Sequence, residues 1–448
     1  MSADLVARAL AVTVRRSAQK SANTLALIAA VRRNGYCIRP NGSLASGDTP
    51  TLTVGANGAN STINSAAPRS AMVPRTDARL TYLSGVPMLA GPTYPREVYF
   101  TSRGAYYGSA DAEGTPLRAT GYFAYEFVHT GSVFEIPVYG AMGGGGVNLR
   151  VLVNGAIAGT TSVPNALGGL YFVRVAFTEA RSRTVRIETW GIPCNGVHVA
   201  NGNEVTSTGR SYPLVTVIGD SFLEGSGAEV GDMTSIIIAR ALGLNCALAA
   251  VGATGIINPG NRNTSGFPQT PFYEANRLTD LTLSGVTSAH AGTSTNPGLG
   301  LLFGSVNDQG LAPAVFSPFG ATLQAAINNR LQVIVDAWVT ARPGKPLVLM
   351  GPIWPSGLPS NLPPLDIYRI RDGMAEAAWS RAADNVWFID RLQQLRREGI
   401  YTNPNDQAAL YTGGLTGTDA THPTPAGHRH DGLADATQLR RLILTEFG

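Results

Sequence analysis

The second half of the chain alternates between short apolar segments and longer amphipathic segments, and this alternation constrains the fold more than any other feature. Strands that are apolar along their whole length are buried on both faces, as in a parallel sheet covered by helices. Such strands fit residues 214–219, 246–251, 299–304, 346–351 and 386–390. Helical spacing of apolar residues fits 233–242, 321–341, 366–383 and 425–444. From residue 209 onward the sequence therefore predicts an α/β domain with a parallel five-stranded sheet and helices on both faces.

Residues 90–205 have a different period. Apolar and polar residues alternate in short runs such as Val133-Phe134-Glu135-Ile136, and Asn154-Gly155 supplies a turn between two of these runs. Short strands at intervals of about 10 to 20 residues, without helical segments between them, are typical of an antiparallel β-sandwich. The predicted sandwich domain spans residues 90–208.

The N-terminal part divides into two pieces. Residues 3–33 contain good helix formers on helical spacing and several basic residues, so we expect a cationic amphipathic helix within residues 1–35. Residues 40–79 are rich in Asn, Gly, Ser, Thr and Ala, which favours an extended arm or linker over residues 36–89. An isolated helix needs something to pack against. Packing on the protein itself or on a sister subunit is favoured over binding to a membrane surface. As an assembly element, the helix is expected to join sister subunits, with a trimer favoured, or to dock on a larger particle.

Composition excludes several classes of function. Charged residues make up 14% of the chain and form no basic stripe, so we expect no nucleic-acid partner. No run of about 18 apolar residues exists, so we expect no membrane span. The three cysteines are widely spaced, which excludes a disulfide framework or a zinc motif, and no cofactor is indicated. The N-terminus is interrupted by arginines and does not read as a secretory signal.

Two short motifs point to nucleophilic catalysis. Gly219-Asp220-Ser221 follows the first apolar strand, and Asp419-Ala420-Thr421-His422 lies near the C-terminus. A serine hydroxyl needs an imidazole to take its proton and a carboxylate to orient that imidazole. Because the carboxyl ends of parallel strands share one edge of a sheet, these motifs are expected to meet there. Ser221, His422 and Asp419 are the predicted nucleophile, general base and orienting acid of a serine hydrolase.

These motifs, in this order, resemble those of the SGNH (GDSL-type) hydrolases over about residues 212–448. The resemblance implies a flavodoxin-like fold. It also implies an oxyanion amide at Gly255, in Gly252-Ala253-Thr254-Gly255, with Gly252 as the lesser candidate. Asn307, in Gly304-Ser305-Val306-Asn307-Asp308, would be the side-chain donor, although the spacing from Gly304 to Asn307 departs from the family pattern.

Other polar and aromatic residues near these motifs have plainer interpretations. Asp220 is expected to hydrogen-bond its own loop and not to act as a second acid. His428 and His430 lie where a helix begins, which favours capping or surface roles over metal binding. Trp354, Phe267 and Tyr411 either line an acyl or sugar pocket or simply pack.

A sandwich before an SGNH domain resembles acetylxylan-esterase-type carbohydrate esterases and the esterases of phage tails. The resemblance implies a serine esterase that removes short acyl groups, chiefly O-acetyl, from a polysaccharide. The N-terminal helix and polar arm favour the phage setting, in which the protein is part of a virion tail or fibre and contacts other virion proteins. The alternative is a structural or glycan-binding virion protein with a weakly active or inactive SGNH domain. A lipase or thioesterase would need a long apolar channel, which the Gly/Ser/Asn-rich loop 253–270 does not suggest.

Overall fold

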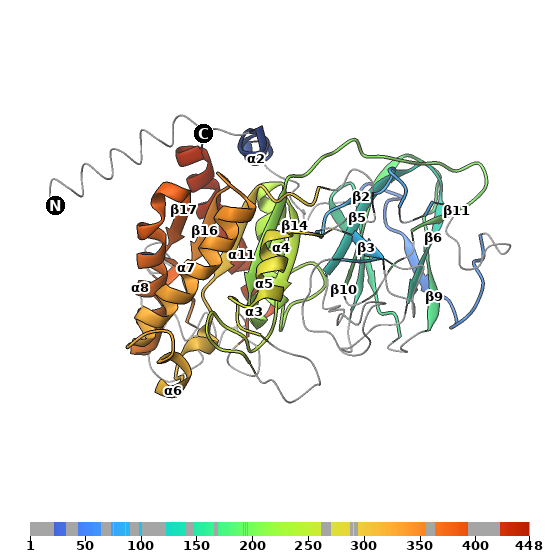
Figure 1. Ribbon diagram of the computed structural model, residues 1–448. Helices are drawn as coiled ribbons and strands as arrows, with labels where there is room; N and C mark the ends of the chain where they lie inside the picture. Colours follow the sequence, from blue (N-terminus) through green and yellow to red (C-terminus); the bar gives the residue numbers. More distant parts are fainter. Residues whose placement is uncertain are drawn as a thin grey trace.

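The computed structural model describes an α/β domain and a β-sandwich that lie side by side (Figure 1). The residues it describes are 22–32, 44–63, 73–74, 76–85, 87–89, 98–100, 122–139, 147–164, 169–190, 192, 194, 196–260, 270–286, 290, 294–354, 363–392 and 422–447.

The α/β domain is built on a parallel five-stranded sheet of order β14-β13-β15-β16-β17. Its strands are β13 (Leu214–Gly219), β14 (Asn245–Ala250), β15 (Leu299–Phe303), β16 (Leu347–Met350) and β17 (Val386–Ile389). Residues of β13, β14, β15 and β16 are buried throughout, which is why their sequences contain no polar alternation. The predicted fold class is confirmed.

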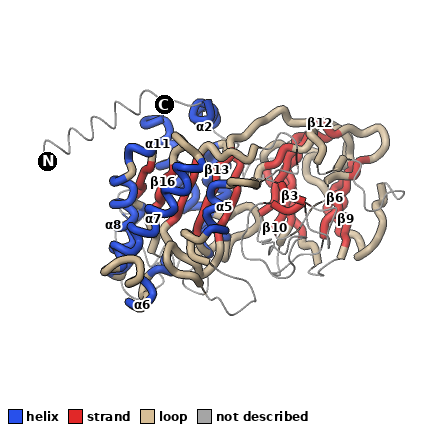
Figure 2. Tube along the Cα trace, in the orientation of Figure 1, coloured by secondary structure: helices blue, strands red, loops and turns tan. Residues whose placement is uncertain are grey.

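Helices cover both faces of this sheet (Figure 2). Contacts group α4 with α11 on one side, and group α5, α7 and α8 on the other. Their bounds are α4 (Thr234–Leu242), α5 (Ala275–Thr282), α7 (Leu323–Ala341), α8 (Leu365–Ser380) and α11 (Pro425–Leu442). Shorter elements are α3 (Ser221–Glu224), η1 (Val306–Asp308), α6 (Pro313–Phe316), η2 (Ala382–Asp384) and η4 (Ile443–Phe447). Among the described helices, none combines the length and the apolarity that crossing a membrane requires.

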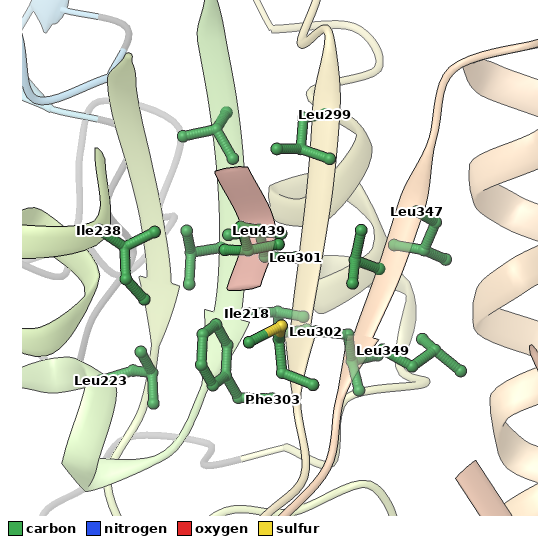
Figure 3. Packing of buried hydrophobic residues seen from close by; sticks show 14 of the residues in the cluster. Ile218, Leu223, Ile238, Leu299, Leu301, Leu302, Phe303, Leu347, Leu349 and Leu439 are labelled. Carbon is green, nitrogen blue, oxygen red and sulfur yellow. The ribbon is translucent and has the colours of Figure 1, made fainter. Parts of the chain in front are cut away.

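The core of the α/β domain lies between the sheet and these helices. Figure 3 shows leucines of β15 and β16 beside Phe303 of β15, with Ile238 and Leu439 contributed by α4 and α11. Fully burying one such side chain contributes about 2 kcal/mol to folding. This packing holds the carboxyl ends of the strands in fixed positions.

The sandwich consists of a four-stranded sheet of order β1-β9-β6-β11 and a six-stranded sheet in which β12-β5-β10-β7-β8 run in order and β2 also pairs with β5. Asn154 and Gly155 both have positive φ (52° and 86°) at the predicted turn between β7 and β8. The strands are β1 (Thr51–Val54), β2 (Thr81–Tyr82), β5 (Tyr122–His129), β6 (Val133–Tyr139), β7 (Leu149–Val153), β8 (Ala156–Thr161), β9 (Leu170–Ala176), β10 (Arg183–Trp190), β11 (His198–Val199) and β12 (Val205–Thr206), with the separate pair β3 (Pro87–Leu89) and β4 (Val98–Phe100).

The expectation of an extended arm over residues 36–89 is wrong where the structure describes that segment. β1 pairs antiparallel with β9 and is part of the sandwich. Asp48 is buried and accepts a hydrogen bond from Arg183 Nε at 2.7 Å, and Ser61 donates to Glu135 Oε2 at 2.6 Å. A polar segment can thus belong to a folded domain, because its partners are buried side chains more than 70 residues away.

The described part of the N-terminal helix packs on the protein itself, one of the placements expected for it. Within the predicted helix, the structure describes α2 (Ala22–Arg32), and the rest of that segment lies outside the described residues. Leu27, Ile28 and Val31 are buried in the core of the α/β domain, and α2 contacts η4. The buried part of α2 therefore packs on the same chain, whereas Leu25 of this helix is 53% exposed.

The two domains are joined along the edge strand β14. The backbone N–H of Cys246 donates to the carbonyl of Leu83 at 3.3 Å, and the N–H of Gly85 donates to Asn245 Oδ1 at 2.6 Å. Leu83 and Tyr122 share one apolar cluster with the α/β domain. Residues 83–85 therefore cover a sheet edge that would otherwise expose unpaired backbone groups.

A buried histidine of the sandwich makes its stability depend on pH. His129 packs against Phe134, with ring centroids 5.0 Å apart. Burial, and secondarily the charge of Arg183, lowers the pKa of His129 from 6.5 to about 4. Between these two values the unfolded chain binds the proton and the folded protein does not, so the free energy of unfolding falls as pH falls.

We expect this histidine to lower the free energy of unfolding by about 2 kcal/mol at pH 5, relative to pH 7.5. Urea unfolding of the wild type and of His129→Phe at both pH values measures it. Relative to the wild type, the free energy of unfolding of His129→Phe should be higher at pH 5 than it is at pH 7.5. An identical difference between the two proteins at both pH values would contradict the prediction.

Candidate active site

Ser221 lies at the point where β13 ends and the short helix α3 begins. Asp220 caps this helix by accepting the N–H of Phe222 at 3.0 Å. A Cβ on Gly219 would lie 2.8 Å from Leu223 Cγ, so the tight strand-to-helix turn requires glycine at this position. The turn holds the serine at the carboxyl edge of the sheet.

His422 meets Ser221 across 201 positions of sequence. Its Nε2 lies 2.8 Å from Ser221 Oγ, a distance at which the hydroxyl donates to a neutral imidazole. His422 lies two residues before Thr424, the N-cap of α11. Its ring packs near that of Phe222, with the two ring centroids 5.5 Å apart. The structure thus brings the predicted nucleophile and base into hydrogen-bond contact.

Asp419, the predicted orienting acid, lies outside the described residues. Its role stays a prediction of the Asp-x-x-His spacing. Phe267 and Tyr411, two of the candidate pocket residues, also lie outside the described part. Trp354 is buried in the core of the α/β domain, beyond the end of β16.

Asp220 links the serine turn to the loop after β15. Its Oδ2 lies 2.6 Å from Ser305 Oγ, and Ser305 in turn accepts the N–H of Asn307 at 3.0 Å. Burial raises the pKa of Asp220, against the opposing effect of its hydrogen bonds to Ser305 and Phe222. These contacts agree with the interpretation of Asp220 as a residue that holds its loop.

Asn307, the predicted side-chain donor, lies beside this network. Its Nδ2 donates to the carbonyl of Thr254 at 3.0 Å and lies 3.5 Å from Asp220 Oδ2. The side chain is half-buried in η1, within the loop after β15. Its amide group is therefore held between the loop after β14 and the serine turn.

The assignment of the oxyanion amide to Gly255 is corrected by the structure. The N–H of Gly255 already donates to the carbonyl of Asn258 at 2.9 Å, and a Cβ on Gly255 would overlap the carboxylate of Asp308. Gly252 is the residue of this loop beside the serine, since a Cβ there would lie 3.5 Å from Ser221 Cβ. The N–H of Gly252 donates to Glu224 Oε2 at 2.6 Å.

Ala253 follows Gly252 and has a left-handed backbone with φ of 60°, unusual for a residue with a Cβ. In the part of the chain that the structure describes, neither the N–H of Ala253 nor that of Ser221 donates a hydrogen bond. A left-handed residue reverses the direction in which its peptide groups point, so it can turn an amide toward a ligand. The backbone N–H groups of Ser221 and Ala253 are therefore available to donate hydrogen bonds to a ligand.

Asp308 is a residue that sequence reasoning missed. Its carboxylate accepts the N–H groups of Ile256, Ile257 and Asn258 at 2.7 to 2.9 Å. Burial raises the pKa of Asp308 to about 6 despite these three bonds. It fixes the loop that carries Ala253, and its position directly after Asn307 was the signal that could have identified it.

His428 has a structural role. Its Nε2 lies 2.9 Å from the carbonyl of Ser226, and its Nδ1 lies 2.9 Å from Thr234 Oγ1. Burial lowers the pKa of His428, which favours the neutral ring. His430 contacts Asp431 at 3.4 Å. Across the described residues, no three His, Cys, Asp or Glu side chains are grouped in a way that could hold a metal ion.

We expect Asn307→Ala to lower turnover of p-nitrophenyl acetate by about 10²- to 10³-fold, the usual cost of one lost oxyanion donor. Asn329→Ala is the matched control, because Asn329 Nδ2 also donates to a backbone carbonyl, that of Phe319, but from α7. Equal turnover of the two folded variants would remove Asn307 from the site.

Comparisons with known proteins place this geometry in a known fold. No protein-family model and no curated protein matches the chain. A solved salicylyl-acyltransferase from a tetracycline biosynthetic pathway matches with 17% identity and a TM-score of 0.58, over 84% of this chain and 98% of its own. An active-site mutant of a family two carbohydrate esterase from Clostridium thermocellum matches with 14% identity and a TM-score of 0.51, over 81% of this chain and 98% of its own. The chain shares the fold of these two proteins, and both likenesses extend beyond the α/β domain into the sandwich.

Proposed function

We propose that this protein is a serine esterase that forms an acyl-enzyme on Ser221. The observation that carries the proposal is the 2.8 Å contact between Ser221 Oγ and His422 Nε2 at the carboxyl edge of a parallel sheet. A hydroxyl in this contact can lose its proton as it attacks, which is what makes serine a useful nucleophile.

The reaction proceeds in two halves. Ser221 Oγ bonds to the acyl carbonyl carbon while its proton moves to His422 Nε2. The tetrahedral intermediate then expels the alcohol oxygen, which takes that proton. Water attacks the acyl-enzyme as His422 removes its proton, the acid leaves, and the proton returns to Ser221. Asp419 is the predicted residue that holds the other ring nitrogen of His422.

The oxyanion in this proposal is stabilised by the N–H groups of Ser221 and Ala253 and by Asn307 Nδ2. Both amides are open in the described part of the chain, and Asn307 would exchange its bond to Thr254 for one to the oxyanion. Donors already held in place act without the cost of reorganising solvent, which is why such sites accelerate acyl transfer strongly.

For the substrate we propose O-acetyl esters of a polysaccharide. The support is a likeness over 81% of this chain to a family two carbohydrate esterase that has been solved in complex with cellohexaose, with a TM-score of 0.50. This likeness is one of fold, so the glycan itself has to be found by experiment.

A second candidate is acyl transfer to an alcohol instead of water. The acyltransferase from the tetracycline pathway has the higher TM-score of the two structures described above, 0.58 against 0.51. Both reactions share the acyl-enzyme and differ only in the acceptor of the second half. The chemistry at Ser221 and His422 is the same in either case.

The test is acetate release from a panel of O-acetylated bacterial and plant glycans, with Ser221→Ala as the matched control. Release by the wild type alone is expected. A parallel assay with p-nitrophenyl acetate and added alcohols separates the two acceptors, since a transferase forms new ester in place of acetate.

Absence of acetate release, ester transfer and fluorophosphonate labelling at Ser221 would overturn the proposal. It would favour the alternative of a structural or glycan-binding protein with an inactive SGNH domain. The homo-oligomer and the virion setting stay predictions, which light scattering of the full chain and its detection in purified particles would test.

A further inference from the structure

The loop between α3 and α4, residues 225–233, contacts both the histidine-bearing segment and the sandwich. It is here called the bridging loop. One of its ends follows the serine helix directly, and the other leads into α4. The loop therefore offers a physical connection between the sandwich and the candidate active site.

Three contacts join the bridging loop to the segment that carries His422. A Cβ on Gly227, which has φ of 85°, would overlap the carbonyl oxygen of Pro423, so the loop backbone lies directly against the residue after His422. The carbonyl of Ser226 accepts from the buried His428 at 2.9 Å. Asp232 Oδ2 accepts from Arg429 at 2.8 Å.

The other carboxylate oxygen of Asp232 faces the sandwich. Arg150 of β7 donates to Asp232 Oδ1 at 3.1 Å and to Glu188 of β10 at 2.6 Å. The side chains of Arg150 and Glu188 are 2% and 0% exposed, and that of Asp232 is 7% exposed. Such pairs are weakly screened by solvent, and losing one partner leaves a buried charge uncompensated.

The sandwich also contacts the backbone of the bridging loop. A Cβ on Gly231 would overlap Arg150 and Glu188, and the carbonyl of Gly231 accepts from Arg240 of α4. Arg240 in turn bonds to Glu188 and to Tyr122. Burial raises the pKa of Glu188, but the charges of Arg150 and Arg240 outweigh it and lower the pKa to about 2. Glu188 therefore stays ionised and keeps both arginines in place.

We propose that Arg150 of the sandwich and Asp232 of the bridging loop are positioning residues for His422, so that the sandwich is part of the catalytic apparatus. The inference rests on the proposed function, because positioning matters only if His422 is the base. Arg150 holds Asp232, Asp232 holds the bridging loop and Arg429, and the loop holds the backbone beside His422. A displacement of about 1 Å in a reacting group can cost about 10²-fold in rate.

The test compares two buried carboxylates changed in the same way. Asp232→Asn weakens the bridge, whereas Glu126→Gln makes the same acid-to-amide change at a carboxylate that binds Arg186 at 2.7 Å within the sandwich sheet. We expect Asp232→Asn to lower kcat for p-nitrophenyl acetate by about 10- to 100-fold with KM within about twofold. Glu126→Gln should keep kcat within about threefold, even if it lowers Tm as much.

Arg150→Met and Arg183→Met form a second pair with the same expected contrast, since Arg183 is a buried sandwich arginine that binds Asp48 at 2.7 Å. If Asp232→Asn fails to fold, Arg429→Met replaces it, since the Arg429 side chain is 41% exposed and its loss removes only the α11 end of the bridge. Equal losses of kcat in the two members of each pair, or wild-type kcat in Asp232→Asn, would overturn the inference.

A second readout separates this inference from the proposed function. In full-length protein labelled with [15N]histidine, the ring signals of His422 should shift or broaden in Asp232→Asn and stay unchanged in Glu126→Gln. A wild type without esterase activity would refute the function and leave this comparison to decide whether the bridge orders His422. An active wild type with an unperturbed His422 in Asp232→Asn would refute the inference alone.

Discussion

Ser221→Ala is expected to lower turnover of p-nitrophenyl acetate by on the order of 10⁵-fold, and His422→Ala by a similar factor. Ser221 Oγ and His422 Nε2 are 2.8 Å apart and act as a unit, so the double variant should lose little more than either single one. Turnover of each purified variant, with circular dichroism to establish folding, measures the effect. Residual activity should come from the oxyanion donors alone.

The control for these variants is Ser317→Ala, which removes another serine hydroxyl from the exposed end of α6. It should keep wild-type turnover. Folded Ser221→Ala with turnover near that of the wild type would remove the acyl-enzyme mechanism, whatever the fold.

A chain reduced to residues 209–448 is expected to be insoluble or to lose nearly all turnover, even on p-nitrophenyl acetate. From the sequence alone, every candidate catalytic residue follows Tyr212, so the catalytic domain is either a separable module or one that the sandwich partly covers. The structure favours the second alternative, since the truncation would uncover the edge strand β14 and remove Leu83 and Tyr122 from the core of the α/β domain. It would also remove Arg150 and Glu188, the sandwich residues that bind Asp232 and Arg240.

Solubility, circular dichroism and turnover of the truncated chain decide the question. A matched control is the full chain with a protease site introduced at the exposed residues 209–211, cut after folding. If the loss of turnover comes from the missing interface, the two pieces of the cut protein should stay associated and active, whereas the truncated chain should be inactive or insoluble. A soluble, folded truncated chain with wild-type turnover would show that the domains are independent.

The same contacts change the expected effect of deleting residues 1–80. From the sequence, this deletion should change assembly and leave turnover per site nearly unchanged. The structure places α2 on the core of the α/β domain and β1 in the sandwich. We now expect the deletion to destabilise both domains and to lower turnover, which thermal unfolding and the ester assay would show together.

The parallel sheet could be predicted from local sequence because its strands carry an unmixed apolar pattern. Val215, Val217 and Ile218 of β13 are buried, and Thr216, the one polar residue of this strand, is buried with them. The contact between Ser221 and His422 could be predicted for a related reason. Strand ends share one edge of such a sheet, and two short motifs at that edge leave few other arrangements.

The loop after β14 shows where local patterns stop being sufficient. Gly252 and Gly255 are both plausible oxyanion residues by motif, and only the path of the backbone separates them. The carboxylate of Asp308 binds the N–H groups of residues 256–258, which turns Gly255 away and leaves Gly252 beside Ser221. Which amides remain open depends on this contact across about 50 positions of sequence.

The sequence by itself determined the layered α/β domain, the strand-rich domain before it and the pairing of Ser221 with His422, because burial patterns and short motifs are local properties. Only the tertiary structure decided that α2, β1 and residues 83–85 belong to these domains, and that Arg150 reaches Asp232. Polar side chains such as Asp48 and Glu188 look like surface residues in a sequence. They become interior residues when partners far along the chain satisfy their charges and hydrogen bonds, and that pairing leaves no periodic signal.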